Sequence, residues 1–525
     1  TTDKFGNGNA STSVLRNFDG STVIYNYLGT MLLPIKILIS GSYYSHFCNI
    51  EINNTCSLDS DIDIFGNLVV DGTLSHSNTG NTIKFIGNSQ ATFSGTGTAN
   101  LKNINSSTNL GLNLTCSNIN IEEMLYNENS SPITNTSSNL ILKSESNHSA
   151  GMLKVGSSSE FNGTLTVERF FSIDNTSFGG WVNITSPIKN TTLSGLANSA
   201  NILLCGDFTG ADFSHNICGN FTSLYFYDET LALGTFENGW KSASDITPTY
   251  DASNTLNIDD APFIWSGPNA NKISLTGTPE LDNYTGIFNV TKSGGSATDD
   301  GWNLISNPYP CSIDWDGFRT RNPTISNVAY SYSPSNTQWS SILPGGSIPH
   351  SQSIFVQTST STTIDFNLSD LSNEYDANFA RSSNGVNNPL IIKINNDVNN
   401  YTDEIYLNSG ANFTEGYDLG FDIGKILTPN PDYAPNIYFL DSSSHKLCHN
   451  YINNNRSLSI PIGVNIGNYA QGNYKLSFYN LPEFMIGSCI TLEDLHNGII
   501  TDLRQDSVYT FFSDSSISVS PRFNL

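Results

Sequence analysis

Short apolar segments recur along the first third of the chain, separated by turns rich in Asn and Gly. They occupy residues 62–65, 68–70, 83–86, 110–114, 119–121, 140–142 and 161–167. Their period-2 alternation predicts β-strands, and their loose spacing of roughly twenty residues predicts a quasi-repeat. One repeat of this size cannot bury its aliphatic face alone, so successive repeats are expected to stack as rungs. The pattern predicts a parallel β-helix, or β-solenoid, over residues 1–165, with an ordinary β-sandwich as the alternative.

Two consecutive stretches, residues 166–285 and 286–384, present the same features in the same order. Each has a Gly-Trp strand that ends at a Pro turn, then an aromatic strand, a hairpin with a Trp and an apolar strand. These features fall at 180–187, 224–227, 240 and 263–265 in the first stretch, and at 301–308, 328–332, 339 and 354–356 in the second. The repetition predicts two related β-sandwich units, or one pseudo-duplicated β domain.

The last stretch, residues 385–525, again alternates between short apolar strands and polar turns. Strands are expected at 390–394, 404–407, 437–440, 458–462, 474–478, 490–494 and 509–512. This series of short strands fits an immunoglobulin-like sandwich. The expected fold class is therefore all-β: a β-solenoid-like N-terminal region followed by β-sandwich domains of jelly-roll or immunoglobulin-like type.

Charge limits the partners that this chain can have. It contains 22 Lys and Arg against 47 Asp and Glu, which gives a net charge of −25. Phosphate binding requires clustered Lys and Arg, so neither nucleic acid nor an anionic membrane surface is expected as a partner. The best apolar run, residues 31–39, is interrupted by Pro34 and Lys36 and is shorter than the ~20 residues of a membrane span, so no membrane insertion is expected.

One run, Gly301–Pro310 followed by Ser312–Asp316, combines two tryptophans, two prolines and an Asn-Pro step. It resembles a motif of large secreted surface proteins of Bacteroidetes that use the type IX secretion system. The similarity extends to other segments of those proteins, at residues 168–170, 180–187, 492–495, 501–503 and 522–523. Cys311 departs from the motif, which usually has a small residue at this position.

The resemblance implies export and display on the outer cell surface, with the type IX secretion and anchoring machinery as partners. In such proteins an N-terminal signal and a C-terminal sorting domain are removed. Residues 1–4 are not followed by the apolar core of a signal peptide, so a processed product is expected here. The resemblance implies no chemistry, because these modules accompany adhesins, structural proteins and enzymes alike.

Two groups of aspartates are candidate functional residues. Asp59, Asp61 and Asp63 alternate and can place three carboxylates on one strand face for Ca²⁺, although the Gly and bidentate Glu of a calcium loop are missing. Asp314 and Asp316 have the spacing of a carboxylate pair for acid–base chemistry, but Asp side chains that cap a turn explain them more simply. No other metal or cofactor is expected.

The eight cysteines form no C-x-x-C zinc pattern. Three pairs are near enough in sequence to close local loops, and the second is favoured: Cys48 with Cys56, Cys205 with Cys218, and Cys448 with Cys489. Cys116 and Cys311 are expected to be free and buried. His445 and His449 lie on either side of Cys448, and a local group of this kind is more often surface than a metal site.

Four tryptophans can stack on sugar rings if they are exposed, although aromatic residues more often fill the core of a β-sandwich. They are Trp240, Trp265, Trp315 and Trp339.

The repeated β units, the sparse charge and the lack of a convincing catalytic motif favour a non-catalytic secreted protein of the cell surface. It would be structural or adhesive: an adhesin, or a subunit of a surface layer or filament. Such a protein would contact other copies of itself, or other surface proteins, through strand edges or lateral faces. A carbohydrate-binding protein with glycans as ligands is one alternative. A secreted polysaccharide-active enzyme is another, and it would need Asp61, Asp63 and Asp71 on one groove of the solenoid.

Overall fold

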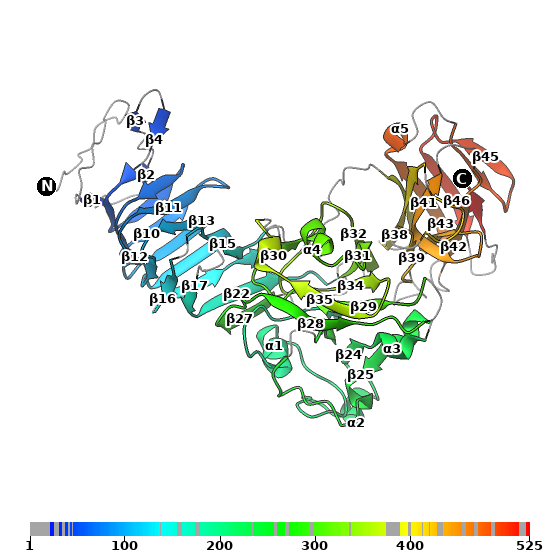
Figure 1. The fold of residues 1–525 in the computed structure, drawn as a ribbon, viewed down its shortest axis with the longest axis horizontal. Helices are drawn as coiled ribbons and strands as arrows, with labels where there is room; N and C mark the ends of the chain where they lie inside the picture. Colours follow the sequence, from blue (N-terminus) through cyan, green and yellow to red (C-terminus); the bar gives the residue numbers. More distant parts are fainter. Residues whose placement is uncertain are drawn as a thin grey trace.

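The computed structural model is an elongated, mostly β molecule (Figure 1), which confirms the predicted all-β fold class with a β-helix region. The solenoid lies at one end and the C-terminal sheet at the other, with the duplicated stretch between them. The structure describes residues 22–25, 31–33, 37–39, 42–44, 46–129, 131–136, 138–146, 148–154, 160–173, 179–233, 235–256, 260–267, 272–294, 298–334, 338–373, 389–396, 401–411, 413–418, 421–427, 434–453, 458–466, 471–484, 489–513 and 521–525.

The N-terminal region is a parallel solenoid with three faces. The first face has the order β1-β6-β9-β12-β14-β16-β21, the second β2-β7-β10-β13-β15-β17-β22, and the third β5-β8-β11-β13-β15-β20. The strands are β1 Thr22–Tyr25, β2 Met31–Leu33, β5 His46–Phe47, β6 Asn49–Ile52, β7 Thr55–Leu58, β8 Ile62–Ile64, β9 Leu68–Val70, β10 Thr73–His76, β11 Thr82–Gly87, β12 Ala91–Ser94, β13 Thr98–Thr108, β14 Leu112–Leu114, β15 Asn118–Asn127, β16 Ile133–Asn135, β17 Asn139–Leu142, β20 Gly151–Lys154, β21 Phe161–Gly163 and β22 Leu165–Phe170. Two hairpins accompany them: β3 Ile37–Ile39 with β4 Ser42–Tyr44, and β18 Ser144–Glu145 with β19 His148–Ser149.

Inward-facing side chains stack from rung to rung and form the solenoid core. Leu112 is in register with Ala91 on one side and Ile133 on the other, and all three are fully buried. The outward-facing residues between them are polar, which is the alternation that the sequence shows. At the C-terminal end β27, Lys272–Gly277, pairs antiparallel with β22, so the second face does not end in an open strand edge at the last rung.

The two repeated stretches form two four-stranded sheets with the same strand order. The first sheet runs β23-β26-β24-β25 and the second β29-β34-β31-β32, so the first, fourth, second and third strands of each repeat lie side by side. Their bounds are β23 Trp181–Asn183, β24 Leu224–Tyr227, β25 Trp240–Ser242 and β26 Phe263–Trp265, then β29 Trp302–Ser306, β31 Ile325–Ser333, β32 Gln338–Ile342 and β34 Ser353–Thr358. The sequence features that recur therefore occupy equivalent positions in the two sheets.

Aromatic side chains join the two sheets face to face. Phe263 of β26 stacks on Trp240 within its own sheet and on Trp339 of the other sheet, with ring centroids 5.1 and 6.1 Å apart. The opposite face of the first sheet, with Leu224 and Ile264, belongs to the same apolar cluster as the solenoid. One sandwich is thus made from the two repeats, and it is fused to the solenoid through its outer face.

Smaller elements complete the molecule; most of them lie around this sandwich, and the last helix lies beside the C-terminal sheet (Figure 1). The further strands are β28 Tyr284–Val290, β30 Ser312–Asp314, β33 Ser347–Ile348, β35 Thr362–Phe366 and β36 Leu371–Ser372. The helices are α1 Leu193–Ser199, α2 His215–Cys218, α3 Glu229–Ala232, α4 Trp315–Arg321 and α5 Leu481–Phe484, with 3₁₀ turns η1 Phe236–Gly239, η2 Ala243–Asp245 and η3 Leu368–Asp370. Among the described residues, no helix has the length and apolar character needed to cross a membrane.

The C-terminal strands belong to one continuous sheet with the order β45-β44-β47-β42-β40-β41-β38-β37-β43-β46. The sheet curls back on itself. The ring of Phe511, on the end strand β46, lies 5.0 Å from the ring of Phe523 on β47, near the opposite end of the strand order. The strands are β37 Leu390–Asn396, β38 Thr402–Gly410, β39 Ile423–Gly424, β40 Asn436–Leu440, β41 Lys446–Asn453, β42 Pro461–Asn465, β43 Gly472–Tyr479, β44 Thr491–Asp494, β45 Ile499–Asp502, β46 Val508–Ser513 and β47 Phe523–Asn524.

Candidate functional site

The most extended group of charged side chains lies along one edge of the solenoid, where each rung turns from the second face to the third. We call this edge the polar corner and define it as residues 59–61, 76–81, 102–103, 122–123, 143–146 and 148, together with Glu168 and Lys272 at its C-terminal end. In most rungs a turn makes this corner, but β13 and β15 run through it without a break. The register between them shifts after Leu101, so Glu122 and Glu123 together oppose Lys102. This is the arrangement of a β-bulge, which turns the strand and redirects its side chains.

The bulge gives its two glutamates different surroundings. Glu123 is buried, and its carboxylate accepts hydrogen bonds from the backbone N–H of Gly80 (3.0 and 3.1 Å) and from Asn103 Nδ2 (2.8 Å). Glu122 is partly exposed and forms an ion pair with Lys102. Glu123 therefore fastens three successive rungs together, whereas Glu122 balances a cation at the surface.

Histidines flank this bulge, and burial keeps both from becoming cations. His76 Nδ1 accepts a hydrogen bond from Lys102 N (3.0 Å), which places the proton of the neutral ring on Nε2. Burial, assisted by the charge of Lys102, lowers the pKa of His76 to about 4. Burial is also the largest cause that lowers the pKa of His148, at the next rung. Near neutral pH the bulge therefore consists of two glutamates, one lysine and uncharged imidazoles.

The C-terminal end of the polar corner is a chain of ion pairs. Glu168 of β22 accepts from Lys143 Nζ (2.9 Å) and from Lys272 Nζ (3.1 Å), and Lys272 also pairs with Glu145 (2.9 Å). Lys272 belongs to the antiparallel strand β27, so these contacts attach the covering strand to the last rung. Chemically, this cluster is suited to holding rungs in register.

The aspartates predicted to bind Ca²⁺ lie at the start of the polar corner, but they are not gathered. Asp61 Oδ1 accepts a hydrogen bond from Thr82 N (2.8 Å) in the next rung. Asp63 lies on β8 in register with Lys84 of the adjacent rung, and Asp59 occupies the turn that precedes Asp61. Within the described part of the chain, no three His, Cys, Asp or Glu side chains are arranged to hold a metal ion. The three aspartates therefore do not form a carboxylate cluster of the kind predicted for Ca²⁺.

The carboxylates required for a polysaccharide-active solenoid are also apart. Asp71 Oδ1 accepts hydrogen bonds from Thr96 N (2.8 Å) and Thr96 Oγ1 (3.0 Å). It follows β9, at the turn between the first and second faces, whereas Asp61 stands between the second and third faces. Asp61, Asp63 and Asp71 therefore do not share one groove.

Asp314 and Asp316 serve as turn and helix caps. Asp314 is the N-cap of α4 and accepts a hydrogen bond from Gly317 N (2.7 Å), while Asp316 accepts one from Gly345 N (2.9 Å). Trp315 between them is fully buried. The simpler interpretation of this pair, Asp side chains that cap a turn, describes what the structure contains.

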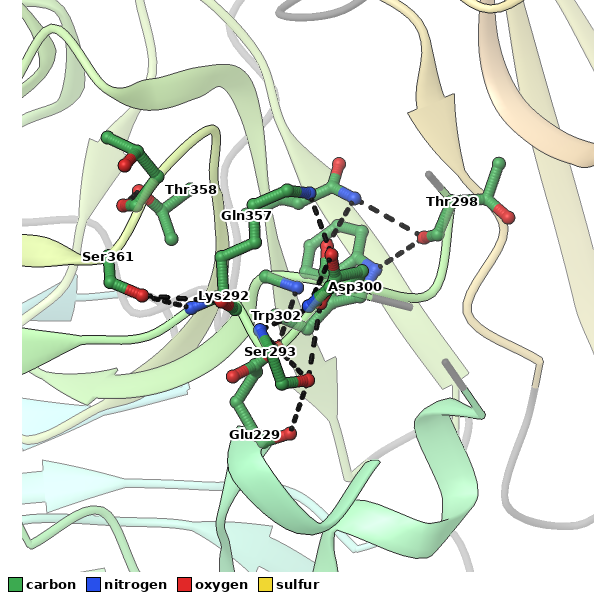
Figure 2. A network of polar contacts seen from close by, with 12 residues as sticks. Glu229, Lys292, Ser293, Thr298, Asp300, Trp302, Gln357, Thr358 and Ser361 are labelled. Atoms are coloured by element: carbon green, nitrogen blue, oxygen red, sulfur yellow. Dashed lines mark hydrogen bonds and ion pairs between the residues drawn. The ribbon is translucent and has the colours of Figure 1, made fainter. Parts of the chain in front are cut away.

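The Gly301 run is anchored by a buried network that reaches into both repeats (Figure 2). Glu229, at the first turn of α3, accepts hydrogen bonds from Ser293 N (2.8 Å) and Gly301 N (3.1 Å). Gly301 has φ +79°, and a Cβ there would lie 2.4 Å from the carbonyl oxygen of Thr358. Glycine is therefore required at this position, both for its backbone conformation and for the close approach of β34.

A second buried carboxylate completes this network. Asp300 accepts hydrogen bonds from Ser293 N (3.0 Å) and Gly294 N (3.0 Å) and pairs with Lys292 Nζ (3.0 Å). Figure 2 shows Ser293 between Asp300 and Glu229, which belong to different repeats. The network thus joins the two repeats at the entrance of the strand that begins with Trp302. Its contacts are those of a structural junction.

The four tryptophans considered for sugar stacking divide into two groups. Trp315 and Trp339 are buried, and Trp240 packs against the aromatic core. Trp265 is half-buried, and its ring lies 5.8 Å from the exposed ring of Phe221. Only the last of the four therefore stands beside an exposed aromatic ring.

The cysteines are mostly free thiols. The structure joins Cys205 to Cys218 by a disulfide. The pairing considered for Cys448 and Cys489 does not form, because Cys448 is buried in β41 against Ser341 whereas Cys489 is exposed. Cys48 and Cys56 are free as well, and so are the buried Cys116 and Cys311.

His445 and His449 do not act together. His445 Nδ1 bonds to Asp441 Oδ2 (2.7 Å) at a turn. His449 is buried, stacks on Tyr406 with ring centroids 4.4 Å apart, and bonds through Nε2 to Ser341 Oγ (3.2 Å). Burial lowers the pKa of His449 to about 3. The two residues therefore have separate structural roles.

The polar corner escaped the sequence analysis, although a signal for it exists. In β15 the inward series Ile119, Ile121 and Leu125 keeps its period of 2 with the charged Glu123 within it, whereas in β13 the inward series shifts by one residue between Leu101 and Ile104. Such a slip of one residue in a period-2 pattern indicates a bulge between the two strands. The partners of the two glutamates, however, come from other rungs at irregular spacing.

Comparison with protein families, with curated proteins and with solved structures finds no match to this chain.

Proposed function

We propose that this chain is a secreted structural or adhesive protein of the outer cell surface, exported by type IX secretion. The observation that carries the proposal is the use of the polar corner. Its carboxylates bind the backbone and the lysines of neighbouring rungs, from Gly80 to Lys272, and so stiffen a rod. A rigid rod that continues into a fused sandwich suits a spacer or a subunit that carries load, and its chief role is mechanical.

Contacts with further copies or with other surface proteins are part of this proposal. In the C-terminal sheet β45 stands at the end of the strand order, paired with β44 among the described residues. Its Ile499 and Ile500 are 49% and 66% exposed. An end strand with exposed branched apolar side chains is a favourable place for edge-to-edge pairing.

The experiment that tests the proposal is electron microscopy of the protein isolated from the surface of its source cells, with mass spectrometry of both termini. We expect ordered filaments or layers, and loss of surface display when type IX export is disabled. Asp61→Asn with Asp63→Asn should leave assembly and display intact. If the protein stayed inside cells with intact type IX export, the proposal would be contradicted. Loss of assembly or display in the aspartate variant would contradict it as well.

Glycan binding is a second candidate function, favoured by the contact between Trp265 and Phe221. A half-buried indole beside an exposed ring offers an apolar surface on which a pyranose can stack. On a glycan array we expect Trp265→Ala to abolish any binding. Phe512→Ala removes a ring that is 55% exposed on the distant strand β46, and it serves as the matched control. Equal loss in both variants would argue against a site at Trp265.

A further inference from the structure

A histidine in the disulfide-closed loop of the first repeat lies between a carboxylate and two hydroxyl groups. His215 Nδ1 is 3.2 Å from Asp207 Oδ2, and its Nε2 is 2.9 Å from Thr222 Oγ1 and 3.4 Å from Ser244 Oγ. The two hydroxyl oxygens are 3.2 Å apart. A carboxylate on Nδ1 fixes the imidazole tautomer that leaves Nε2 free to accept a hydroxyl proton. This is the order of groups in a nucleophile–base–acid triad.

The surroundings hold these groups in place. The Cys205–Cys218 disulfide closes the loop that carries both Asp207 and His215. The backbone N–H of His215 donates to Asp207 Oδ1 (2.9 Å), while the ring Nδ1 of the same histidine contacts Oδ2. Both oxygens of the carboxylate are therefore held by His215. None of these contacts involves the polar corner or the Glu229 network.

Ser244 is the more accessible of the two hydroxyl groups. It is half-buried at the 3₁₀ turn η2, whereas Thr222 is only 5% exposed. Ser244 Oγ accepts a hydrogen bond from the backbone N–H of Asp207 (3.0 Å), which places a donor beside this oxygen. Gly206 has φ +141°, and a Cβ there would lie 2.9 Å from Ser244 Oγ. Glycine keeps the space next to the hydroxyl open.

From this geometry we propose that Asp207, His215 and Ser244 form a hydrolytic site for carboxylic esters. Ser244 is the nucleophile and His215 the general base. Asp207 is a positioning residue that acts through His215, and Thr222 holds the imidazole from the buried side. The proposal goes beyond the mechanical role proposed above and does not depend on it.

The reaction balances with water as the only co-reactant. Ser244 Oγ attacks the ester carbonyl carbon while its proton passes to His215 Nε2. The C–O bond to the alcohol then breaks, His215 returns the proton to the leaving oxygen, and an acyl ester remains on Ser244. Water attacks this ester, with its proton taken by His215, and the carboxylic acid is released as the Ser244 hydroxyl is restored.

Nearby side chains indicate the substrate class. Leu203, Phe213, Ile217 and Phe221 are all more than a third exposed and lie within or next to the disulfide loop. Asp207 itself is a largely exposed carboxylate, which disfavours an anionic substrate. An uncharged ester with an apolar acyl group is therefore the class that this site would accept.

The test uses the full-length oxidised protein with p-nitrophenyl butyrate as substrate and a fluorophosphonate as covalent probe. We expect hydrolysis above the buffer rate and a single phosphonyl adduct on Ser244, located by peptide mass spectrometry. Ser244→Ala and His215→Gln should each lower kcat/KM by about 10²–10⁴-fold, with circular dichroism unchanged. The matched control is Ser253→Ala, because Ser253 is another serine of the same repeat whose hydroxyl is hydrogen-bonded, here to Asp251 Oδ1 (2.6 Å) and not to His215.

Asp207→Asn tests the positioning role. It should lower kcat more than it raises KM and should change the pH profile, which a purely structural carboxylate would leave alone. Replacing both Cys205 and Cys218 with Ser should lower kcat as well, because the loop that aligns Asp207 with His215 is released. A rate no higher than buffer for the wild-type protein would overturn the proposal. An adduct on Thr222 or elsewhere would overturn the assignment of Ser244.

Discussion

Some buried charges in this protein are held in pairs, and Lys425 with Asp403 is one of them. Their side chains are 4% and 8% exposed, and Nζ lies 2.6 Å from Oδ1. Asp403 Oδ2 also accepts the backbone N–H of Ile437 (2.7 Å). The attraction between buried charges offsets their loss of hydration only while both partners are present. The contribution of each residue to the stability of the fold therefore depends on the presence of the other.

Lys425→Met should destabilise the fold by about 3–5 kcal/mol, because it leaves the Asp403 carboxylate buried without its cation. Removal of both charges, in Lys425→Met with Asp403→Leu, should cost clearly less than the single change. Urea denaturation measures both free energies of unfolding. Arg504→Ala, which breaks an exposed pair with Asp502, is the control and should leave the stability unchanged. A double variant no more stable than Lys425→Met would contradict this account.

Asp422 should make the stability depend on pH. Burial is the main cause that raises the pKa of this carboxyl to about 7; backbone hydrogen bonds from Asp418 and Tyr451 oppose the rise, and the charges of Asp418 and Asp441 add to it. Between its ordinary pKa and pH 7 the folded state therefore binds a proton that the unfolded state has released, so this group lowers the stability as pH rises through that interval. The amide of the Asp422→Asn variant cannot ionise, so this variant should lack this part of the pH dependence of stability.

The measurement for Asp422 is the free energy of unfolding of both proteins from pH 4 to pH 8. Stability of the wild type relative to Asp422→Asn should fall by on the order of 2–4 kcal/mol between pH 4 and pH 7 and then level off slowly above pH 7. A difference that stays constant over this range would show that Asp422 ionises normally in the folded protein.

At the scale of elements, the bulge in β15 gives two adjacent glutamates opposite importance. Glu123 satisfies a backbone N–H and an amide from two other rungs, whereas Glu122 is a partly exposed partner of Lys102. Loss of an acceptor leaves buried donors unpaired, which costs more than loss of a surface ion pair. The bulge is thus both a bend in the strand and a fastening between rungs.

Glu123→Ala should lower the free energy of unfolding by about 1–3 kcal/mol and speed hydrogen exchange at the Gly80 amide. Glu122→Ala, one residue away, should cost less than about 1 kcal/mol and leave that amide protected. Urea denaturation and hydrogen-exchange mass spectrometry report the two effects. Similar behaviour of the two variants would mean that the bulge does not separate their roles.

Elements were more predictable from the sequence than the contacts between them. The sequence features near Gly180, Leu224, Trp240 and Phe263 recur in the second repeat, and the two sheets have the same strand order. This could be predicted because each feature is local. Glu123, in contrast, meets Gly80 only through the stacking of rungs with unequal turn lengths. Ser244 reaches His215 through a separate turn of the same repeat. Neither distance can be read from spacing along the chain.

At the scale of the whole molecule, apolar clusters extend across the boundaries between regions. One cluster contains Trp302 and Phe355 of the duplicated sandwich together with Ile392 and Phe523 of the C-terminal sheet. Polar contacts cross the same boundary, including Tyr330 OH to the Gly424 carbonyl oxygen (3.3 Å). A shared core makes separate unfolding of the two parts unfavourable, because each would expose apolar surface of the other.

His449→Ala tests this coupling, since His449 lies in the C-terminal sheet and bonds to Ser341 of the sandwich (3.2 Å). The cavity and the unpaired hydroxyl should cost about 2 kcal/mol or more, which for a cooperative unit of this size corresponds to a Tm lower by ~2 °C or more. Calorimetry should show one transition for both parts, and tryptophan fluorescence, which reports on the sandwich, should move by the same amount. His445→Ala, at a partly exposed turn on the C-terminal sheet, is the matched control and should shift Tm much less. If His449→Ala moved only a separate C-terminal transition and left the tryptophan signal in place, the two parts would be independent domains in spite of their common core.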